Sequence, residues 1–295
     1  MKYTNFFESD DIKRIICLGR FDGVHLGHRS IILQASKLKQ KFGNDIRLSV
    51  FAFRRLDEAG GRNRIYTFDE NCDLIQSLTV DEVLFAEETE RFFDTTKSEF
   101  LNLLFKNHNP VAVVCGEDYT FGKDRAGNVC YLREYCAEHN VLFLSLPILC
   151  ENGKKVSSTL IKEDLLVGNV QEANTLLGSR YHIIGTVLHG RSVGHTIGFP
   201  TLNVAVSPLK CPVKTGVYST LTTVDGKVYK SLTNYGSAPT FGQTEILAES
   251  YLLDFNEDVY GKTVKTEFVG FIRDDVKFDT VSDLIAQLKK DVENL

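Results

Sequence analysis

Residues 13–28 read KRIICLGRFDGVHLGH and join an apolar segment to a glycine-rich turn that holds two histidines. Residues 13–18 (KRIICL), which end in four apolar residues, predict a buried strand. Apolar positions at helical spacing over residues 29–42 predict an amphipathic helix. A turn between such elements presents backbone N–H groups at the positive end of the helix dipole, where a phosphate is favoured. His25 and His28 are three residues apart, so on a helix they share a face and can point at one anion together. A tight turn with two surface histidines is the alternative interpretation.

The composition is that of a globular protein, since 43% of the 295 residues are hydrophobic and 25% are charged, and the length allows about two domains. A net charge of -5 gives no electrostatic argument for a nucleic acid or an anionic membrane as partner. The first residues lack the basic and apolar regions of a signal peptide, and no apolar run reaches membrane-spanning length. Seven cysteines without a Cys-x-x-Cys pair indicate a reducing compartment and no structural zinc. We therefore expect a cytoplasmic protein, and the sequence leaves its oligomeric state open, a homo-oligomer included.

Strand and helix signals alternate through roughly the first 180 residues. Further strands are predicted at residues 46–53, 81–85, 111–115 and 141–146. Further helices are predicted at residues 69–77, 96–105, 129–139, 159–167 and 170–177. This alternation is typical of a parallel α/β sheet, so we expect a first domain over residues 1–180.

From residue 181 the pattern changes to short β-rich runs separated by glycine, proline and Asp-Gly turns. These runs lie at residues 182–188, 217–224, 228–233, 247–255 and 263–271. Asp225-Gly226 between two of them is a hairpin signal. Thr280 and Asp283 indicate a capped terminal helix. An antiparallel barrel closed by a C-terminal helix is the simplest interpretation of residues 181–295.

Three polar segments of the first half are expected to meet where the parallel strands end, the usual place for a ligand in such a sheet. They are the histidine turn, residues 116–122 (GEDYTFG) and residues 156–159 (VSST). The last segment has a plain alternative explanation, because serine and threonine are ordinary helix N-caps.

The strongest signal of the second half is residues 185–203, GTVLHGRSVGHTIGFPTLN. Thr201 and Asn203 are two residues apart, so on an extended segment both project from the same face. Their hydroxyl and amide oxygens are hard ligands of the kind that suits Mg²⁺ bridging nucleotide phosphates. A barrel turn with a proline-fixed corner is the alternative. The residues that suit a loop around a polyphosphate are Gly190, Arg191, Gly194, His195, Thr196 and Gly198.

Glu249 lies in a strand-like run, in which alternation places it on one face with Leu247 and Tyr251. A carboxylate among apolar neighbours serves as a general base with a raised pKa, or it is only a charge at the rim. The sequence does not separate these two interpretations.

Together these residues resemble the bifunctional prokaryotic riboflavin kinase/FAD synthetase family, in the family's order and over almost the whole chain. In the first half the matching motifs are residues 21–28, 116–122 and 156–159. In the second half they are residues 198–203, 216–218, 234–242, 253–255, 260–262 and 271–274. The resemblance implies a Rossmann-like nucleotidyltransferase domain with a parallel sheet, followed by a riboflavin kinase-like antiparallel barrel with a terminal helix.

The resemblance also implies a reaction: ATP phosphorylates riboflavin to FMN, and a second ATP adenylylates FMN to FAD with release of pyrophosphate. Thr201 and Asn203 would hold Mg²⁺, and Glu249 would accept the proton of the ribityl hydroxyl. His25 and His28 would stabilise charge on the phosphates of the second ATP. Further phosphate contacts implied in the first domain are Gly19, Phe21, Asp22, Gly23, Gly27, Ser157, Ser158, Thr159 and Lys162. Implied flavin contacts are Asp118 and Phe121 in the first domain, and Asn234 and Arg273 in the second.

Departures from the family pattern fall mostly in the first half. Arg20 stands where the family usually has asparagine, and residues 51–56 lack the proline and histidine of its Phe-x-Pro-His-Pro segment. Lys162 replaces an arginine, which keeps the charge but loses the two-pronged phosphate contact, and Arg54 or Arg55 is the candidate to compensate. These departures favour an alternative, a riboflavin kinase with weakened or lost adenylyltransferase activity. A flavin-binding or nucleotide-binding regulator is a third hypothesis, which the intact kinase motifs disfavour.

Overall fold

The computed structural model describes residues 1–43, 45–55, 64–189, 197–240, 243–293 and 295. Contacts divide the chain into two compact units, one of Met1–Gly61 with Tyr66–Ser158 and one of Arg62–Ile65 with Thr159–Leu295. The domain boundary expected at residue 180 stays a prediction. Within the described residues, no helix is long and apolar enough to cross a membrane.

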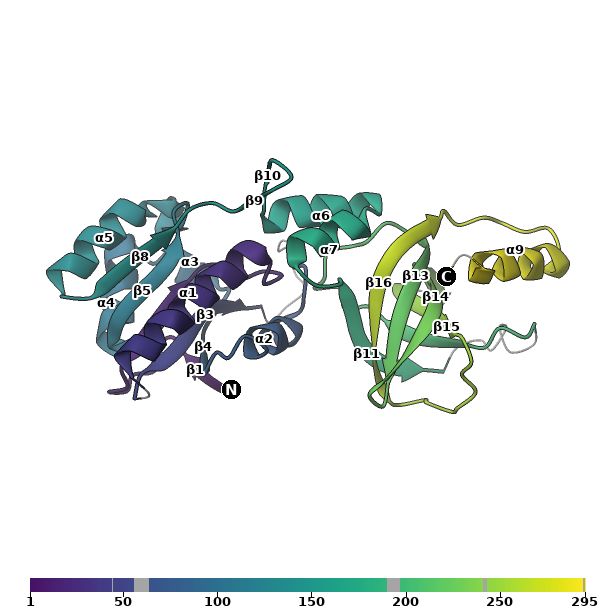
Figure 1. The fold of residues 1–295 in the computed structure, drawn as a ribbon, viewed down its shortest axis with the longest axis horizontal. Helices are drawn as coiled ribbons and strands as arrows, with labels where there is room; N and C mark the ends of the chain where they lie inside the picture. Colours follow the sequence, from purple (N-terminus) through teal and green to yellow (C-terminus); the bar gives the residue numbers. More distant parts are fainter. Residues whose placement is uncertain (44, 56–63, 190–196, 241–242, 294) are drawn as a thin grey trace. The chain divides into compact units, whose positions relative to one another are not determined.

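The first unit is built on a parallel sheet with the strand order β1-β4-β3-β2-β5-β8 (Figure 1). Hydrogen-bonded neighbours in this sheet are parallel, which confirms the predicted α/β class. The edge strand β1 was not predicted from the sequence, because its four residues KYTN show no apolar pattern. The strands are β1 (Lys2–Asn5), β2 (Arg14–Leu18), β3 (Arg47–Arg54), β4 (Glu82–Glu87), β5 (Pro110–Gly116) and β8 (Leu142–Leu146).

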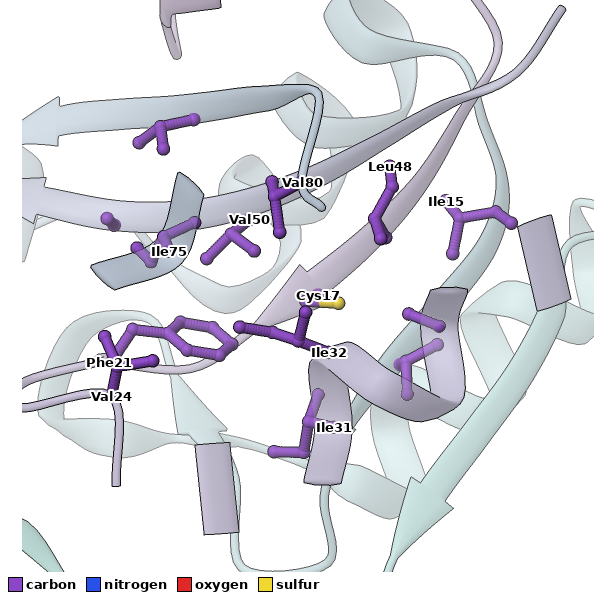
Figure 2. Close-up of a cluster of buried hydrophobic side chains, with 14 of the residues drawn as sticks. Ile15, Cys17, Phe21, Val24, Ile31, Ile32, Leu48, Val50, Ile75 and Val80 are labelled. Carbon is purple, nitrogen blue, oxygen red and sulfur yellow. The ribbon is translucent and has the colours of Figure 1, made fainter. Parts of the chain in front are cut away.

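Helices cover both faces of this sheet. A strand sends alternate side chains to opposite faces, so an apolar strand needs a partner on each face to bury them. Ile15 and Cys17 of β2 join a buried cluster with side chains of α1 and α2 (Figure 2). Ile16 and Leu18 join a second cluster with side chains of α3, α4 and α5. The strand is therefore buried on both faces, which explains its unbroken apolar run. The helices are α1 (Leu26–Phe42), α2 (Phe68–Gln76), α3 (Glu90–Phe93), α4 (Lys97–His108) and α5 (Val129–Glu138).

Short elements fill the loops that follow β5 and β8. The loop after β5 holds β6 (Thr120–Phe121), the 3-10 helix η1 (Lys123–Arg125) and β7 (Gly127–Asn128). The hairpin β9 (Cys150–Glu151) with β10 (Lys154–Lys155) follows β8. The helices α6 (Ser158–Val167) and α7 (Val170–Leu177) come next, and α7 packs on β16 of the barrel.

A cluster of buried charges lies at the amino ends of the parallel strands. Arg14 of β2 and Glu82 of β4 are both fully buried, and their side chains pair at 2.7 Å. Asp10 pairs with the same guanidinium at 2.6 Å, and hydroxyls of Thr4 and Ser49 donate to Glu82 at 2.8 Å each. Burial alone would raise the pKa of Glu82, but the hydrogen bonds from Arg14, Ser49 and Thr4 outweigh it and lower the pKa to about 2. The carboxylate therefore stays ionised in the core.

The second unit is a closed barrel with the strand order β11-β12-β15-β14-β13-β16, and its pairs are antiparallel. The predicted barrel and terminal helix are confirmed. Asp225 and Gly226 join β13 to β14 with positive φ values of 47° and 80°, as a two-residue hairpin turn requires. The elements are β11 (His182–Leu188), β12 (Thr201–Ala205), β13 (Gly216–Val224), β14 (Lys227–Thr240), β15 (Gln243–Leu252), β16 (Thr263–Arg273) and α9 (Val281–Glu293).

One face of the barrel strands carries a chain of buried hydroxyl groups. Thr222 and Thr220 each lie 2.8 Å from the hydroxyl of Ser231, Thr220 lies 2.6 Å from Thr233, and Thr233 lies 2.8 Å from Ser250. These residues are at most 1% exposed. Buried hydroxyls must pair, so the chain fixes how β13, β14 and β15 align.

Candidate active sites

The turn between β2 and α1 has an unusual backbone. Phe21 and Val24 are fully buried, yet they adopt positive φ values of 47° and 43°. Gly23 between them has a φ of 87°, which costs a glycine little. The turn is therefore a left-handed segment that the surrounding structure must hold in place.

The two histidines of the turn stack on one another. Their ring centroids are 3.6 Å apart at an interplanar angle of 18°, and the ring of Phe21 lies 4.8 Å from His28. His25 caps α1, since its Nδ1 accepts from the backbone N–H of His28 at 3.4 Å. Nδ1 of His28 is buried and has no hydrogen-bond partner among the described residues. A Cβ at Gly27 would lie 3.2 Å from the His25 ring, so the small residue there makes room for the stack.

Both rings are neutral near pH 7. Burial lowers the pKa of His25 to about 4, although the negative charges of Asp22 and Asp118 act in the opposite direction. Burial, and then the neighbouring His25, also hold the pKa of His28 well below its ordinary value. The pair therefore offers neutral N–H groups to an anion, and a bound phosphate would raise both pKa values.

The buried His25 predicts that the first unit loses stability in mild acid. The pKa of this ring is about 4 in the folded state and 6.5 as a free group, so between these values the unfolded chain binds more protons. Lowering the pH from 7 to 5 should cost about 2 kcal/mol through this group. Urea unfolding followed by circular dichroism measures the free energy of unfolding at both pH values. His25→Asn should reduce the loss of this free energy between pH 7 and pH 5. His139→Asn, at an exposed histidine of the same unit, should leave the loss unchanged. Equal pH dependence in the two variants would contradict the prediction.

The loop after β5 reaches the histidine turn through Asp118, whose charge acts on the pKa of His25. Oδ2 of Asp118 accepts from Nζ of Lys155 at 2.6 Å, and its Oδ1 fills the space beside Gly116. Phe121 is 6% exposed and packs in the core, stacked at 5.6 Å from Tyr119. The charge of Asp118 thus acts on the turn, and the flavin contacts predicted for Asp118 and Phe121 stay predictions.

The serine-rich segment also meets the turn. Ser158 is the first residue of α6, and its hydroxyl donates to the backbone carbonyl of Asp22 at 2.7 Å. Its neighbour Ser157 precedes the helix. Thr159 and Lys162 are grouped by contacts with the second unit, and their predicted roles stay predictions. Ser158 therefore acts on the turn through hydrogen bonding rather than as an isolated cap.

The arginines that depart from the family pattern have partners at the carboxyl ends of the strands. Arg20 pairs with Glu88 at 3.6 Å. The guanidinium carbon of Arg54 lies 5.7 Å from the ring centroids of both Phe68 and Phe85. That cation–π arrangement orients Arg54, whose compensating phosphate contact stays a prediction.

In the barrel, the strand register brings three predicted site residues into one row. Asn203 of β12 lies opposite Glu249 of β15, and Glu249 lies opposite Asn234 of β14. Residues directly opposite in antiparallel strands share a face, so these side chains are neighbours. Thr201 lies two residues before Asn203 and joins the same face. Asn203 is 9% exposed, Glu249 is half-buried and Asn234 is exposed. Solvent exposure therefore increases along the row from Asn203 to Asn234.

This row fits a divalent cation bound together with phosphates. It offers a hydroxyl, amide oxygens and a carboxylate, all hard donors of the type that Mg²⁺ prefers. Among the described residues, no group of three His, Cys, Asp or Glu side chains could hold a metal by itself. Phosphate oxygens and water would have to complete the coordination.

Two other predicted contact residues of the barrel are Gly198 and Arg273, and their phosphate and flavin contacts stay predictions. Gly198 has a φ of 82° and precedes Phe199, whose ring lies 5.0 Å from that of Tyr251. Arg273 holds Asp291 of α9 through two nitrogens, at 2.8 and 2.9 Å. Outside the described residues lie the predicted phosphate-loop positions Gly190, Arg191, Gly194, His195 and Thr196.

The side chains that hold the predicted site residues in place were not predicted from the sequence. Asn71 of α2 contacts the histidine turn, Lys155 pairs with Asp118, and Asp291 holds Arg273. Each partner is distant along the chain, as with Asn71, which is 50 residues from Phe21. No local spacing could have found them.

Comparison with known proteins identifies the family of the chain. A FAD synthetase model matches residues 7–160, and a riboflavin kinase model matches residues 177–295. The chain belongs to the bifunctional riboflavin kinase/FMN adenylyltransferase family. A relative of that name from Haemophilus influenzae is 31% identical, over 94% of this chain and 92% of its own. The Bacillus subtilis relative is 32% identical, over 97% of this chain and 93% of its own.

A solved structure shares the fold of this riboflavin kinase/FAD synthetase. It is described as a macrolide-efflux protein from Streptococcus pneumoniae, with a TM-score of 0.88 and 30% identity. The likeness covers 99% of this chain and 98% of the other. The fold agreement therefore extends over both units.

Proposed function

We propose that the enzyme makes FMN at the row of Asn203, Glu249 and Asn234 in the barrel and FAD at the histidine turn. Riboflavin and ATP give FMN and ADP, and FMN with a second ATP gives FAD and pyrophosphate. The observation that carries this proposal is that each family model matches a different half, and each half holds one candidate site. The alternative of a kinase without adenylyltransferase activity is not favoured, because the FAD synthetase match spans residues 7–160.

In the kinase step, Glu249 accepts the proton of the ribityl 5′-hydroxyl as that oxygen attacks the γ-phosphorus of ATP and ADP leaves. Thr201 and Asn203 would hold Mg²⁺, which would neutralise charge on the phosphates. The register supports this division of roles, because it sets the carboxylate directly beside the amide of Asn203. Phosphoryl transfer depends mainly on positioning and charge stabilisation, which such a row can supply.

In the adenylyl step, a phosphate oxygen of FMN attacks the α-phosphorus of ATP, and pyrophosphate leaves. The stacked His25 and His28 donate neutral N–H groups to the phosphates, and the backbone N–H groups at the start of α1 add to them. Asp118 contacts the flavin in this proposal, and its carboxylate accepts a hydrogen bond from Lys155 at 2.6 Å.

His28→Ala tests the adenylyl site. Loss of one donor to the developing charge should lower the rate of FAD formation from FMN by about 10²-fold, while FMN formation from riboflavin stays within about twofold. Both products are measured by chromatography of the flavins. His139→Ala is the matched control, since it removes an exposed histidine of the same unit. A normal FAD rate in the His28 variant would discredit the proposed role.

We also propose a cytoplasmic location and a boundary near residue 180 between two domains. Five of the seven cysteines are buried as free thiols, which suits a reducing compartment. The kinase match begins at residue 177, close to the expected boundary.

A further inference from the structure

The histidine turn is held from outside at consecutive backbone positions. Its two buried left-handed residues, Phe21 and Val24, are costly for non-glycine side chains, so neighbouring groups must stabilise them. Ser158 donates to the carbonyl of Asp22 at 2.7 Å, and Nε of Arg29 donates to the carbonyl of Val24 at 3.0 Å. Two further contacts come from one side chain on α2.

Asn71 binds the turn twice with its single amide. Its Nδ2 donates to the carbonyl of Phe21 at 2.8 Å, and its Oδ1 accepts from the N–H of Gly23 at 3.1 Å. An amide offers a donor and an acceptor on one short planar group, and it keeps both at every pH at which the protein is folded. The two contacts hold the left-handed residues Phe21 and Gly23, which lie directly before Val24 and the histidine pair.

The helix that carries Asn71 is itself well anchored. Thr67 and Glu70 form a capping box at its start, with hydrogen bonds of 3.3 and 2.8 Å. Cys72 and Ile75 are buried in the core cluster that also contains Phe21 and Val24. Asn71 therefore connects a rigid element to a strained one.

We propose that Asn71 is a positioning residue for adenylyl transfer, acting through the turn on His25 and His28. It holds the backbone of residues 21–24 in the form that sets the stacked histidines and the first N–H groups of α1 at the phosphates. This inference rests on the proposed role of the turn in binding ATP.

Two variants of the full chain separate the two contacts. Asn71→Ala removes both. Asn71→Asp keeps an acceptor for the N–H of Gly23 but sets a carboxylate oxygen against the carbonyl oxygen of Phe21. We expect kcat for FAD formation from FMN to fall by about 10²-fold in both variants, because small displacements of reacting groups carry costs of that size. FMN formation from riboflavin should stay within about twofold.

Hydrogen exchange and a control distinguish positioning from damage to the fold. Exchange of the Gly23 amide should quicken in Asn71→Ala and stay slow in Asn71→Asp. Gln76→Ala, at an exposed site on the same helix, should change neither exchange nor kinetics. An unchanged kcat for FAD formation in Asn71→Ala, with faster Gly23 exchange, would overturn the proposal. So would a loss that parallels the unfolded fraction measured by circular dichroism. If instead the unaltered protein makes no FAD from FMN, it is the proposed function that fails.

Discussion

Glu249→Gln is expected to stop FMN formation while adenylylation of supplied FMN continues. Glutamine keeps the shape of the side chain but cannot accept the proton of the attacking hydroxyl. Loss of a general base of this kind costs about 10²- to 10⁴-fold in rate. The measurement is the rate of each product, with riboflavin and FMN supplied separately.

The matched control is Glu257→Gln, at an exposed carboxylate in the segment after β15. It should leave both rates unchanged. The two variants should differ because only Glu249 lies in the row, between Asn203 and Asn234 on neighbouring strands. Equal loss of both activities in Glu249→Gln would show that the two reactions do not occupy separate sites.

Glu82→Gln should destabilise the first unit by about 3 kcal/mol, the lower end of the cost of breaking a buried ion pair by removing one partner. The substitution removes the fully buried carboxylate that lies 2.7 Å from the guanidinium of Arg14, while Asp10 still pairs with that guanidinium at 2.6 Å. Urea unfolding at pH 7 measures the loss. Glu87→Gln, at the other end of the same strand, should cost far less. A loss below about 1 kcal/mol in Glu82→Gln, the range of exposed ion pairs, would contradict the account.

The same carboxylate predicts a second acid effect, below that of His25. The pKa of Glu82 is lowered to about 2 in the folded state from 4.5 as a free group. The stability that ionised Glu82 contributes to the folded first unit is therefore complete above pH 4.5 and is lost as the pH falls toward 2.

The local parts of the fold could be predicted from the sequence because they depend on nearby residues. The strand and helix around the histidine turn follow from apolar periodicity. The hairpin follows from the Asp225-Gly226 pair between two strand-like runs, since these residue types accept the positive φ values that a two-residue turn requires. That Thr201 and Asn203 share a face follows from the two-residue period of a strand. These predictions needed no knowledge of the tertiary structure.

Contacts between distant segments could not be predicted in the same way. The row of Asn203, Glu249 and Asn234 depends on the register of three strands, which the closed barrel and its buried hydroxyl chain determine. The pairing of Arg14 with Glu82 depends on the strand order of the sheet. Local patterns carry neither kind of information.

The histidine turn shows both the reach and the limit of sequence reasoning. Its position between strand and helix, and the proximity of its two histidines, agree with the structure. No local pattern indicates that His25 and His28 stack, or that burial keeps them neutral. Nor could it indicate the contacts of Asn71 with the turn.

The most direct test of the two-site account is to incubate the purified protein with Mg²⁺ and ATP, adding riboflavin in one sample and FMN in another. Chromatography then resolves the flavins over time. The account predicts that riboflavin gives FMN and then FAD, and that supplied FMN gives FAD. FMN from riboflavin, with no FAD from either substrate, would contradict it.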